Sequence, residues 1–281
     1  MISDPFVYPG GGLRQIPVDR NLSGQSSLDW VAEEVPVALV YNGISQAVLM
    51  TTPSELEELA VGFSLSEGIV KDNSDIYEIS ASQTCQGVQV DLRISSECFW
   101  NLKTRRRSMA SRTGCGLCGI EQLGQVRLPT GSLPDTARFA LANYAQALGH
   151  LTRAEQLGSR TGCTHAAVWV AENAEMLASS EDVGRHVALD KLLGKRALAG
   201  GSQGAVLVSS RASFEMVQKA AMCGVQILFA VSAPTALAVE VAAGCGMTLV
   251  GFCRPGSFNV YCNPQRLYGE PLFDAAKKPG R

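Results

Sequence analysis

Two cysteines separated by two residues, Cys115 and Cys118, are the strongest chemical signal in the sequence, and glycines stand at positions 114, 116 and 119 around them. So many glycines with little apolar patterning predict a mobile, exposed loop. The thiolate is the reactive form of cysteine, and neighbouring positive charge increases its fraction by lowering the thiol pKa. Arg112 and the three arginines at 105–107 supply such charge, although an arginine run is equally typical of a solvated helix face.

Several chemistries suit this cysteine pair. A structural zinc needs four ligands, and the sequence has no second close pair of cysteines or histidines. Cys163, His165 and His186 could complete such a site only if the fold brings them to the cysteine pair. Thiol-disulfide exchange is less well supported, because the pair does not follow a strand and open a helix as in thioredoxin-like folds. In a sulfur relay, one thiolate accepts sulfane sulfur from a donor persulfide and offers it to an acceptor, and the neighbouring thiol can release it. The remaining interpretation is a solvated, glycine-rich turn in which the two cysteines have no chemical role.

A second group of polar residues lies at 161–167 (TGCTHAA) and 181–186 (EDVGRH). Both segments are expected where loops meet regular elements. A zinc deaminase would need a histidine two residues before a glutamate and a proline before a cysteine pair. The chain has neither, which argues against base deamination. Asp182 could equally be a helix cap before His186.

A third group of residues follows three predicted strands. Because the carboxyl ends of parallel strands meet at one edge of a sheet, hydroxyls, arginines and helix N-termini there can hold phosphate. The sequence therefore predicts a nucleotide-sized anion site, although no phosphate-binding glycine motif defines the nucleotide. Alternatively, Ser232 and Thr235 only cap a helix and Arg211 only pairs with Glu215. The residues are 209–213 (SSRAS), 232–235 (SAPT) and 252–257 (FCRPGS).

The elements that position these groups follow from turn residues and periodicity. Strands are predicted at 35–41 and 44–50, joined by a tight turn at Asn42 and Gly43, and Pro36 marks the first strand as an edge. The segment 52–55 (TPSE) predicts a helix capped by the hydroxyl of Thr52. A half-buried strand is predicted at 88–94 from its alternating apolar residues.

The second half of the chain alternates strand-like and helical runs, which predicts an α/β fold with a largely parallel sheet. The predicted strands are 166–170, 205–209, 227–231 and 248–252, and the predicted helices are 187–193, 214–222 and 236–243. A stretch with two prolines and a glycine separates the halves. We expect a loosely ordered arm (1–30), an N-terminal α+β domain (31–124, with the cysteine loop at 111–119), a linker (125–135), an α/β domain (136–267) and a tail (268–281).

Composition limits the partners of the protein. The 281 residues are 46% hydrophobic and 18% charged, which is typical of a globular protein, and the formal charge is -2. No overall positive field would attract nucleic acid or an anionic membrane, so an anion site has to be built locally. The N-terminus lacks the pattern of a secretory signal and no membrane span is evident, which favours the cytoplasm. Nine cysteines cannot all form disulfides.

Several long segments in one order resemble the FdhD family of formate dehydrogenase accessory sulfurtransferases. The resemblance covers Val35 to Tyr261 and is carried by VPVALVYNGIS, GFSLSEGIV, RTGCGLCG, TGCTHAA, EDVGRHVALDKLLG, SSRASFEMVQKAAMCG, VSAPT and GFCRPGSFNVY. It implies a cytoplasmic sulfur carrier that takes sulfur from a cysteine desulfurase and passes it to the molybdenum bis(molybdopterin guanine dinucleotide) cofactor, a bound substrate, for formate dehydrogenase. No permanent cofactor is implied.

The resemblance also implies site residues and a fold. The persulfide cysteine falls on Cys115, with Cys118 as its companion. The cofactor-binding segment falls on Phe252, Cys253, Arg254, Pro255, Gly256 and Ser257. The implied fold is a three-layer α/β/α domain similar to cytidine deaminases beside a smaller α+β domain, and the implied assembly is a homodimer. The other hypothesis is a non-catalytic chaperone that binds the cofactor and formate dehydrogenase, with the cysteines holding zinc or nothing.

Overall fold

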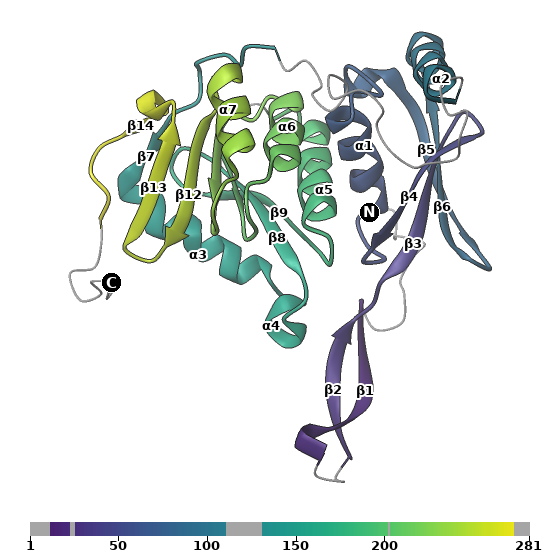
Figure 1. The fold of residues 1–281 in the computed structure, drawn as a ribbon, viewed down its shortest axis with the longest axis horizontal. Helices are drawn as coiled ribbons and strands as arrows, with labels where there is room; N and C mark the ends of the chain where they lie inside the picture. The colour runs from purple at the N-terminus through teal and green to yellow at the C-terminus, as the bar shows by residue number, and fades with distance from the viewer. Residues whose placement is uncertain (1–11, 23–25, 111–130, 202, 273–281) are drawn as a thin grey trace.

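The computed structural model describes residues 12–22, 26–110, 131–201 and 203–272 (Figure 1). Cys115, Cys118 and the first part of the expected linker lie outside these residues. The helices are α1 Leu56–Ser66, α2 Ser96–Ala110, α3 Tyr144–Ala154, α4 Gly158–Thr161, α5 Arg185–Leu198, α6 Phe214–Met222 and α7 Ala236–Cys245. The strands are β1 Leu13–Asp19, β2 Ser26–Ala32, β3 Val35–Tyr41, β4 Ile44–Thr51, β5 Ile76–Thr84, β6 Gly87–Ile94, β7 Phe139–Ala140, β8 His165–Val170, β9 Met176–Asp182, β10 Ala205–Val208, β11 Ile227–Ala230, β12 Thr248–Arg254, β13 Ser257–Cys262 and β14 Leu267–Tyr268.

The N-terminal unit is a four-stranded sheet in the order β4-β3-β6-β5, with α1 packed on its apolar face. The tight turn is confirmed, since both Asn42 and Gly43 have positive φ, 44° and 83°. The prediction that β3 is an edge strand is wrong, because β3 lies between β4 and β6. Pro36 is tolerated because the parallel pairing with β6 begins one residue later, at Val37.

Two further expectations for this half are corrected. The first 30 residues were expected to lack regular structure, but β1 and β2 form an antiparallel hairpin that projects from the body (Figure 1). Helix α1 begins at Leu56 without a side-chain cap, because Glu55 adopts a left-handed φ of 57°. The hydroxyl of Thr52 does not cap this helix and instead donates to the buried carboxylate of Asp182. The three arginines at 105–107 lie in α2.

The C-terminal unit is a six-stranded sheet in the order β13-β12-β11-β10-β8-β9. Helices α5, α6 and α7 cover one face and α3 covers the other, which gives three layers. The α/β class is confirmed, and the predicted strands and helices of this half all occur. The sheet is not largely parallel, however, because only β10 with β11 and β11 with β12 pair in parallel, while β8, β9 and β13 pair antiparallel.

The two units meet where α1 crosses α5 with the helix backbones in contact. A Cβ atom on Gly62 would overlap the main-chain oxygen of Asp190, and a Cβ on Gly194 would overlap that of Glu58. Only glycine allows two helix backbones to approach so closely. In the described residues no helix is long and apolar enough to span a membrane.

Candidate functional site

One edge of the six-stranded sheet collects the polar segments that the sequence analysis identified. Strands β10, β11, β12 and β9 end there, β8 begins there, and the N-termini of α5, α6 and α7 lie above it (Figure 1). Ser213 caps α6 by accepting from the main-chain N–H of Met216, and Thr235 caps α7 by accepting from that of Ala238. The capping role proposed for Thr235 is therefore confirmed.

The loops after β10, β11 and β12 continue the sheet by main-chain hydrogen bonds. Ser232 donates its N–H to the carbonyl of Ser210 at 3.3 Å and accepts from the N–H of Phe252 at 3.2 Å. Arg254 reaches back to the main-chain carbonyl of Val231 at 2.7 Å. The structure thus brings Ser232, Phe252 and Arg254 together and places Arg211 directly after Ser210.

Phe252 occupies an unusual conformation at this edge. Its φ is 52° and it lies in a break of the β12–β13 register between Gly251 and Arg254. Such a bulge redirects a side chain away from the sheet ladder, and the ring of Phe252 is 42% exposed. An exposed aromatic ring beside an arginine and a serine can stack on a planar base.

The next residues form a tight turn held from below. Pro255 and Gly256 connect β12 to β13, with Arg254 paired to Ser257 across the turn and Gly256 at a φ of 86°. The hydroxyl of Tyr144, on α3, donates to the carbonyls of Arg254 and Ser257 at 3.1 and 3.0 Å. Nothing in the local sequence pattern of Tyr144 connects it to this turn, so its role is visible only in the structure.

Cys253 points away from this edge of the sheet and into the core. It is 2% exposed, lies in the core beneath the sheet, and burial raises the pKa of its thiol to about 12. Its side chain is therefore packed and protonated, and only its main chain can contribute to a site at this edge.

Asp182 connects the edge to the N-terminal unit. Its carboxylate is fully buried and pairs with Lys191 at 2.6 Å, and it accepts from the N–H and the hydroxyl of Thr52 at 2.9 and 2.8 Å. It also accepts from the N–H of Gly184 at 2.9 Å, which shapes the turn that leads into α5. Asp182 is not the N-cap of α5, because Gly184 occupies that position. Its role in the structure is to tie three segments together.

The loop before β8 is held by Glu181. This carboxylate accepts from the N–H groups of Leu157 and Gly158 at 2.8 and 2.6 Å and from the hydroxyl of Thr164 at 2.5 Å. The exposed Cys163 lies in this loop. Glu181 therefore fixes the segment that precedes His165, a function the sequence pattern did not indicate.

Three basic side chains meet where α5 begins. His165 lies opposite Asp182 across β8 and β9, and burial followed by the charge of Arg185 lowers its pKa. Burial and Arg185 also lower the pKa of His186, whose Nε2 lies 2.9 Å from a Glu215 carboxylate oxygen. Glu215 thus pairs with His186 and not with Arg211, contrary to the alternative interpretation.

No group of three or more histidine, cysteine, aspartate or glutamate side chains that could hold a metal occurs among the residues that the structure describes. Cys163, His165 and His186 therefore do not form a metal centre by themselves. Cys115 and Cys118 lie outside those residues.

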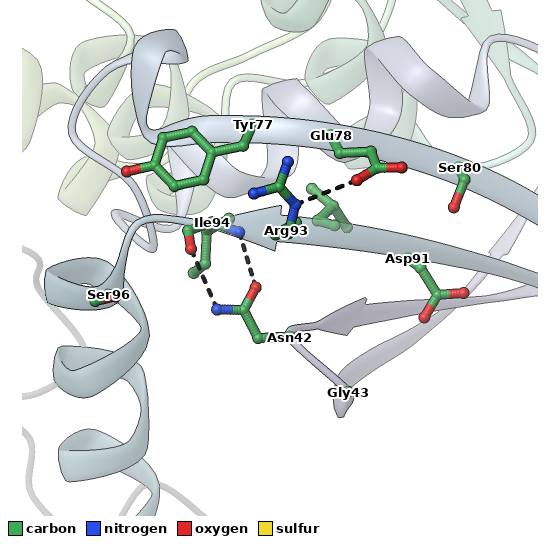
Figure 2. A pocket seen from close by; sticks show the side chains of 10 residues that line it. Asn42, Gly43, Tyr77, Glu78, Ser80, Asp91, Arg93, Ile94 and Ser96 are labelled. Atoms are coloured by element: carbon green, nitrogen blue, oxygen red, sulfur yellow. Dashed lines mark hydrogen bonds and ion pairs between the residues drawn. The ribbon is translucent and has the colours of Figure 1, made fainter.

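A separate pocket of about 500 Å³ lies on β5, β6 and the turn between β3 and β4 (Figure 2). Its polar groups are bonded to one another: Arg93 pairs with Glu78 at 3.2 Å, and the amide of Asn42 bonds both main-chain groups of Ile94. The predicted site residues do not line it. The sheet edge of the C-terminal unit is the better candidate for a functional site.

Two comparisons with known proteins agree with each other. The model of the FdhD/NarQ family matches residues 32–268. The fold is similar to the crystal structure of a candidate formate dehydrogenase accessory protein from Desulfotalea psychrophila, with a TM-score of 0.70 and 26% sequence identity. That match covers 91% of this chain and 98% of the other.

Proposed function

Since the chain belongs to the FdhD/NarQ family, we propose that it serves formate dehydrogenase as a sulfur carrier. It accepts sulfur from a cysteine desulfurase as a persulfide on Cys115 and transfers it to the molybdenum bis(molybdopterin guanine dinucleotide) cofactor. The observation that carries this proposal is the family match over residues 32–268, a span that includes both Cys115 and Cys118. The name of the Desulfotalea psychrophila protein supports formate dehydrogenase as the enzyme served.

The loading step exchanges one sulfur–sulfur bond for another. The Cys115 thiolate attacks the terminal sulfur of the donor persulfide, a new bond forms between the two, and the donor cysteine leaves as a thiolate. Release uses the second thiol: Cys118 attacks the Cys115 sulfur, hydrosulfide leaves toward the acceptor, and a Cys115–Cys118 disulfide remains. A thiol reductant then reopens that disulfide, which restores the pair for another cycle.

The sheet edge supplies a place for the acceptor. Its guanine can stack on Phe252, and its phosphates can take hydrogen bonds from Arg211, Arg254 and the hydroxyl of Ser232. Both α6 and α7 direct their N-termini to this edge, which favours negative charge there. The cytoplasm and a homodimeric assembly remain part of the proposal.

The test is the intact mass of the protein after incubation with a cysteine desulfurase and free cysteine. We expect one added sulfur atom, located on the peptide that contains Cys115 and removed by a thiol reductant. Cys115→Ala should lose it. Cys85 and Cys163 are exposed thiols elsewhere in the structure, so Cys85→Ala and Cys163→Ala are the matched controls and should load normally.

Two results would overturn the proposal. One is stoichiometric sulfur on the Cys115→Ala variant. The other is about one zinc per chain that is lost on Cys118→Ala, because a coordinated thiolate is not available for relay. The second result would favour the non-catalytic cofactor chaperone. Titration with GDP tests the docking site separately, and unchanged affinity in Arg254→Ala would remove Arg254 from it.

A further inference from the structure

We propose that Arg185, His165 and His186 form a second anion subsite on the same edge of the sheet, and that it binds a phosphoryl group. The three side chains come from the start of β8 and from the first two residues of α5. The assignment of this phosphoryl group to the molybdenum cofactor rests on the proposed function, whereas the subsite itself rests on the geometry that follows.

The first observation is that the guanidinium of Arg185 has no counterion among the residues that the structure describes. Among the arginines whose side chains the structure describes, Arg185 and Arg211 alone have no hydrogen bond, ion pair or aromatic contact. The others are engaged, for example Arg93 with Glu78, Arg138 with Asp135 and Arg266 with main-chain carbonyls.

Burial makes the isolation of Arg185 costly. The residue is half-buried, and its Nε is shielded from solvent with no hydrogen-bond partner in the described part of the chain. A shielded polar donor without a partner destabilises the folded protein unless a ligand or water supplies the acceptor. An oxyanion that takes two parallel hydrogen bonds from the guanidinium would satisfy it.

The second observation is the position of Arg185 in its helix. It is the first residue of the 14-residue helix α5, where the helix dipole favours negative charge and disfavours a cation. Gly184, at the N-cap, provides no side-chain acceptor, and the first turn contains no acidic residue. The same dipole and the free N–H groups of the first turn would stabilise a bound phosphoryl group.

The third observation is that two histidines, His165 and His186, lie near the charge of Arg185. His165 faces the α5 side of the sheet, since Ala167, two residues on, lies in the core formed with α5, α6 and α7. Around His165 the charged groups are Arg185, Glu155 and, opposite it on β9, the Asp182 carboxylate that is paired with Lys191. Around His186 they are Arg185, Glu215, Lys219 and Glu67. A bound anion would raise the pKa of both histidines, so that binding takes up protons.

The second subsite lies at a suitable distance from the first. Adjacent strands are about 4.8 Å apart, and β9 is four positions from β12 in the sheet. The two ends of the edge are thus separated by roughly 19 Å, with Arg211 between them. A ligand with several phosphates along an extended chain can contact both ends, which a mononucleotide cannot.

The experiment measures binding of inorganic diphosphate and of sulfate to the full-length protein by calorimetry and by thermal shift. Arg185→Met should weaken diphosphate binding at least about tenfold, and Arg185→Lys should recover part of it because a lysine keeps the charge but loses the paired donors. Arg93→Met, in the separate pocket of Figure 2, is the matched control and should bind as the unsubstituted protein does.

Two further readouts separate a binding role from a structural one. Without ligand, Arg185→Met should unfold at the same temperature or higher, since it removes an unpaired charge. Sulfate does not titrate near neutral pH, and its affinity for the unsubstituted protein should rise as the pH falls through the range where the histidines titrate.

Unchanged diphosphate affinity in Arg185→Met overturns the subsite. The subsite is also overturned if Arg185→Met unfolds at a lower temperature and the unsubstituted protein binds neither diphosphate nor sulfate. Neither result affects sulfur loading on Cys115, so failure of the subsite and failure of the carrier function are distinguishable. Loss of guanosine diphosphate binding but not of inorganic diphosphate binding in Arg185→Met also overturns it.

Discussion

Gly194 is the residue at which a single methyl group should do most damage to the contact between the two units. A Cβ there would lie 2.7 Å from the carbonyl carbon and 3.0 Å from the Cα of Glu58 and would overlap its carbonyl oxygen, whereas ordinary contact begins near 3.4 Å. All three atoms belong to the backbone of α1, so the helices must separate by about 1 Å, which forfeits a quarter to a half of the dispersion energy of each contact.

The magnitude follows from two opposing effects. Overpacking of this kind costs about 3 kcal/mol, at the upper end of the usual range because backbone has to move. Alanine recovers about 1 kcal/mol of helix propensity, which leaves Gly194→Ala destabilised by roughly 2 kcal/mol. Gly149 on α3 is the matched control, since a Cβ there meets nothing within 4 Å, and Gly149→Ala should stabilise the protein by up to about 1 kcal/mol.

The assay is urea unfolding of both variants followed by tryptophan fluorescence and far-ultraviolet circular dichroism. The free energy of unfolding should fall in Gly194→Ala and rise in Gly149→Ala, so that the two variants differ by about 3 kcal/mol. Both spectroscopic signals should report the same difference. If Gly194→Ala is as stable as Gly149→Ala, the backbones of α1 and α5 do not meet at this residue and the proposed close crossing is wrong.

Three other outcomes are expected. Lys191→Met leaves the fully buried Asp182 carboxylate without its cation and should lower the free energy of unfolding by about 3–5 kcal/mol in urea titrations. Burial and a neighbouring guanidinium lower the folded pKa of His165 below 6.5, so the unfolded chain binds the proton more tightly and stability should fall as the pH drops below 6.5; His165→Gln should flatten the profile of unfolding temperature against pH. Iodoacetamide should label the exposed Cys163 well before Cys253, whose burial raises the thiol pKa to about 12, and equal labelling rates measured by peptide mapping would contradict that arrangement.

Local pattern was sufficient for most of the fold. Apolar periodicity and turn residues located the strands and helices of the second half within a few residues, and Asn42 and Gly43 formed the expected turn. The resemblance to the FdhD family is confirmed by the family model. Pairing direction was not predictable in the same way, because a buried strand such as β8 is apolar on both faces whether its neighbours run parallel or antiparallel.

Errors arose where tertiary contacts outweighed a local signal. The segment 52–55 carries a helix-start pattern, but the hydroxyl of Thr52 is used by Asp182, 130 residues away. Pro36 suggested an edge strand because proline has no N–H to donate to a second neighbouring strand. The sequence does not reveal that pairing of β3 with β6 starts only at Val37. The role of Tyr144 depends on carbonyls more than 100 residues away, and no sequence window contains such a contact.

The site could be predicted in part, and the part that was missed has a physical cause. Hydroxyls and arginines after strands are visible in a sequence, so Arg211, Ser232 and Arg254 were found and lie at one edge. Arg185 is equally plain in the sequence, but an arginine indicates an anion site only when the structure shows that no carboxylate pairs with it. In a chain with a net charge of -2, ordinary pairing should neutralise each cation.

The absence of a partner for Arg185 and Arg211, both at the sheet edge, is therefore the strongest electrostatic indication in the described residues. The two carboxylates at the end of β9 already have other partners. Glu181 accepts from the N–H groups of Leu157 and Gly158, and Asp182 pairs with Lys191. Glu181 and Asp182 are thus already satisfied by other partners, which leaves the arginines to an external anion. A protein that evolved this edge only for stability would have paired the half-buried Arg185, because an unpaired buried charge lowers the free energy of unfolding.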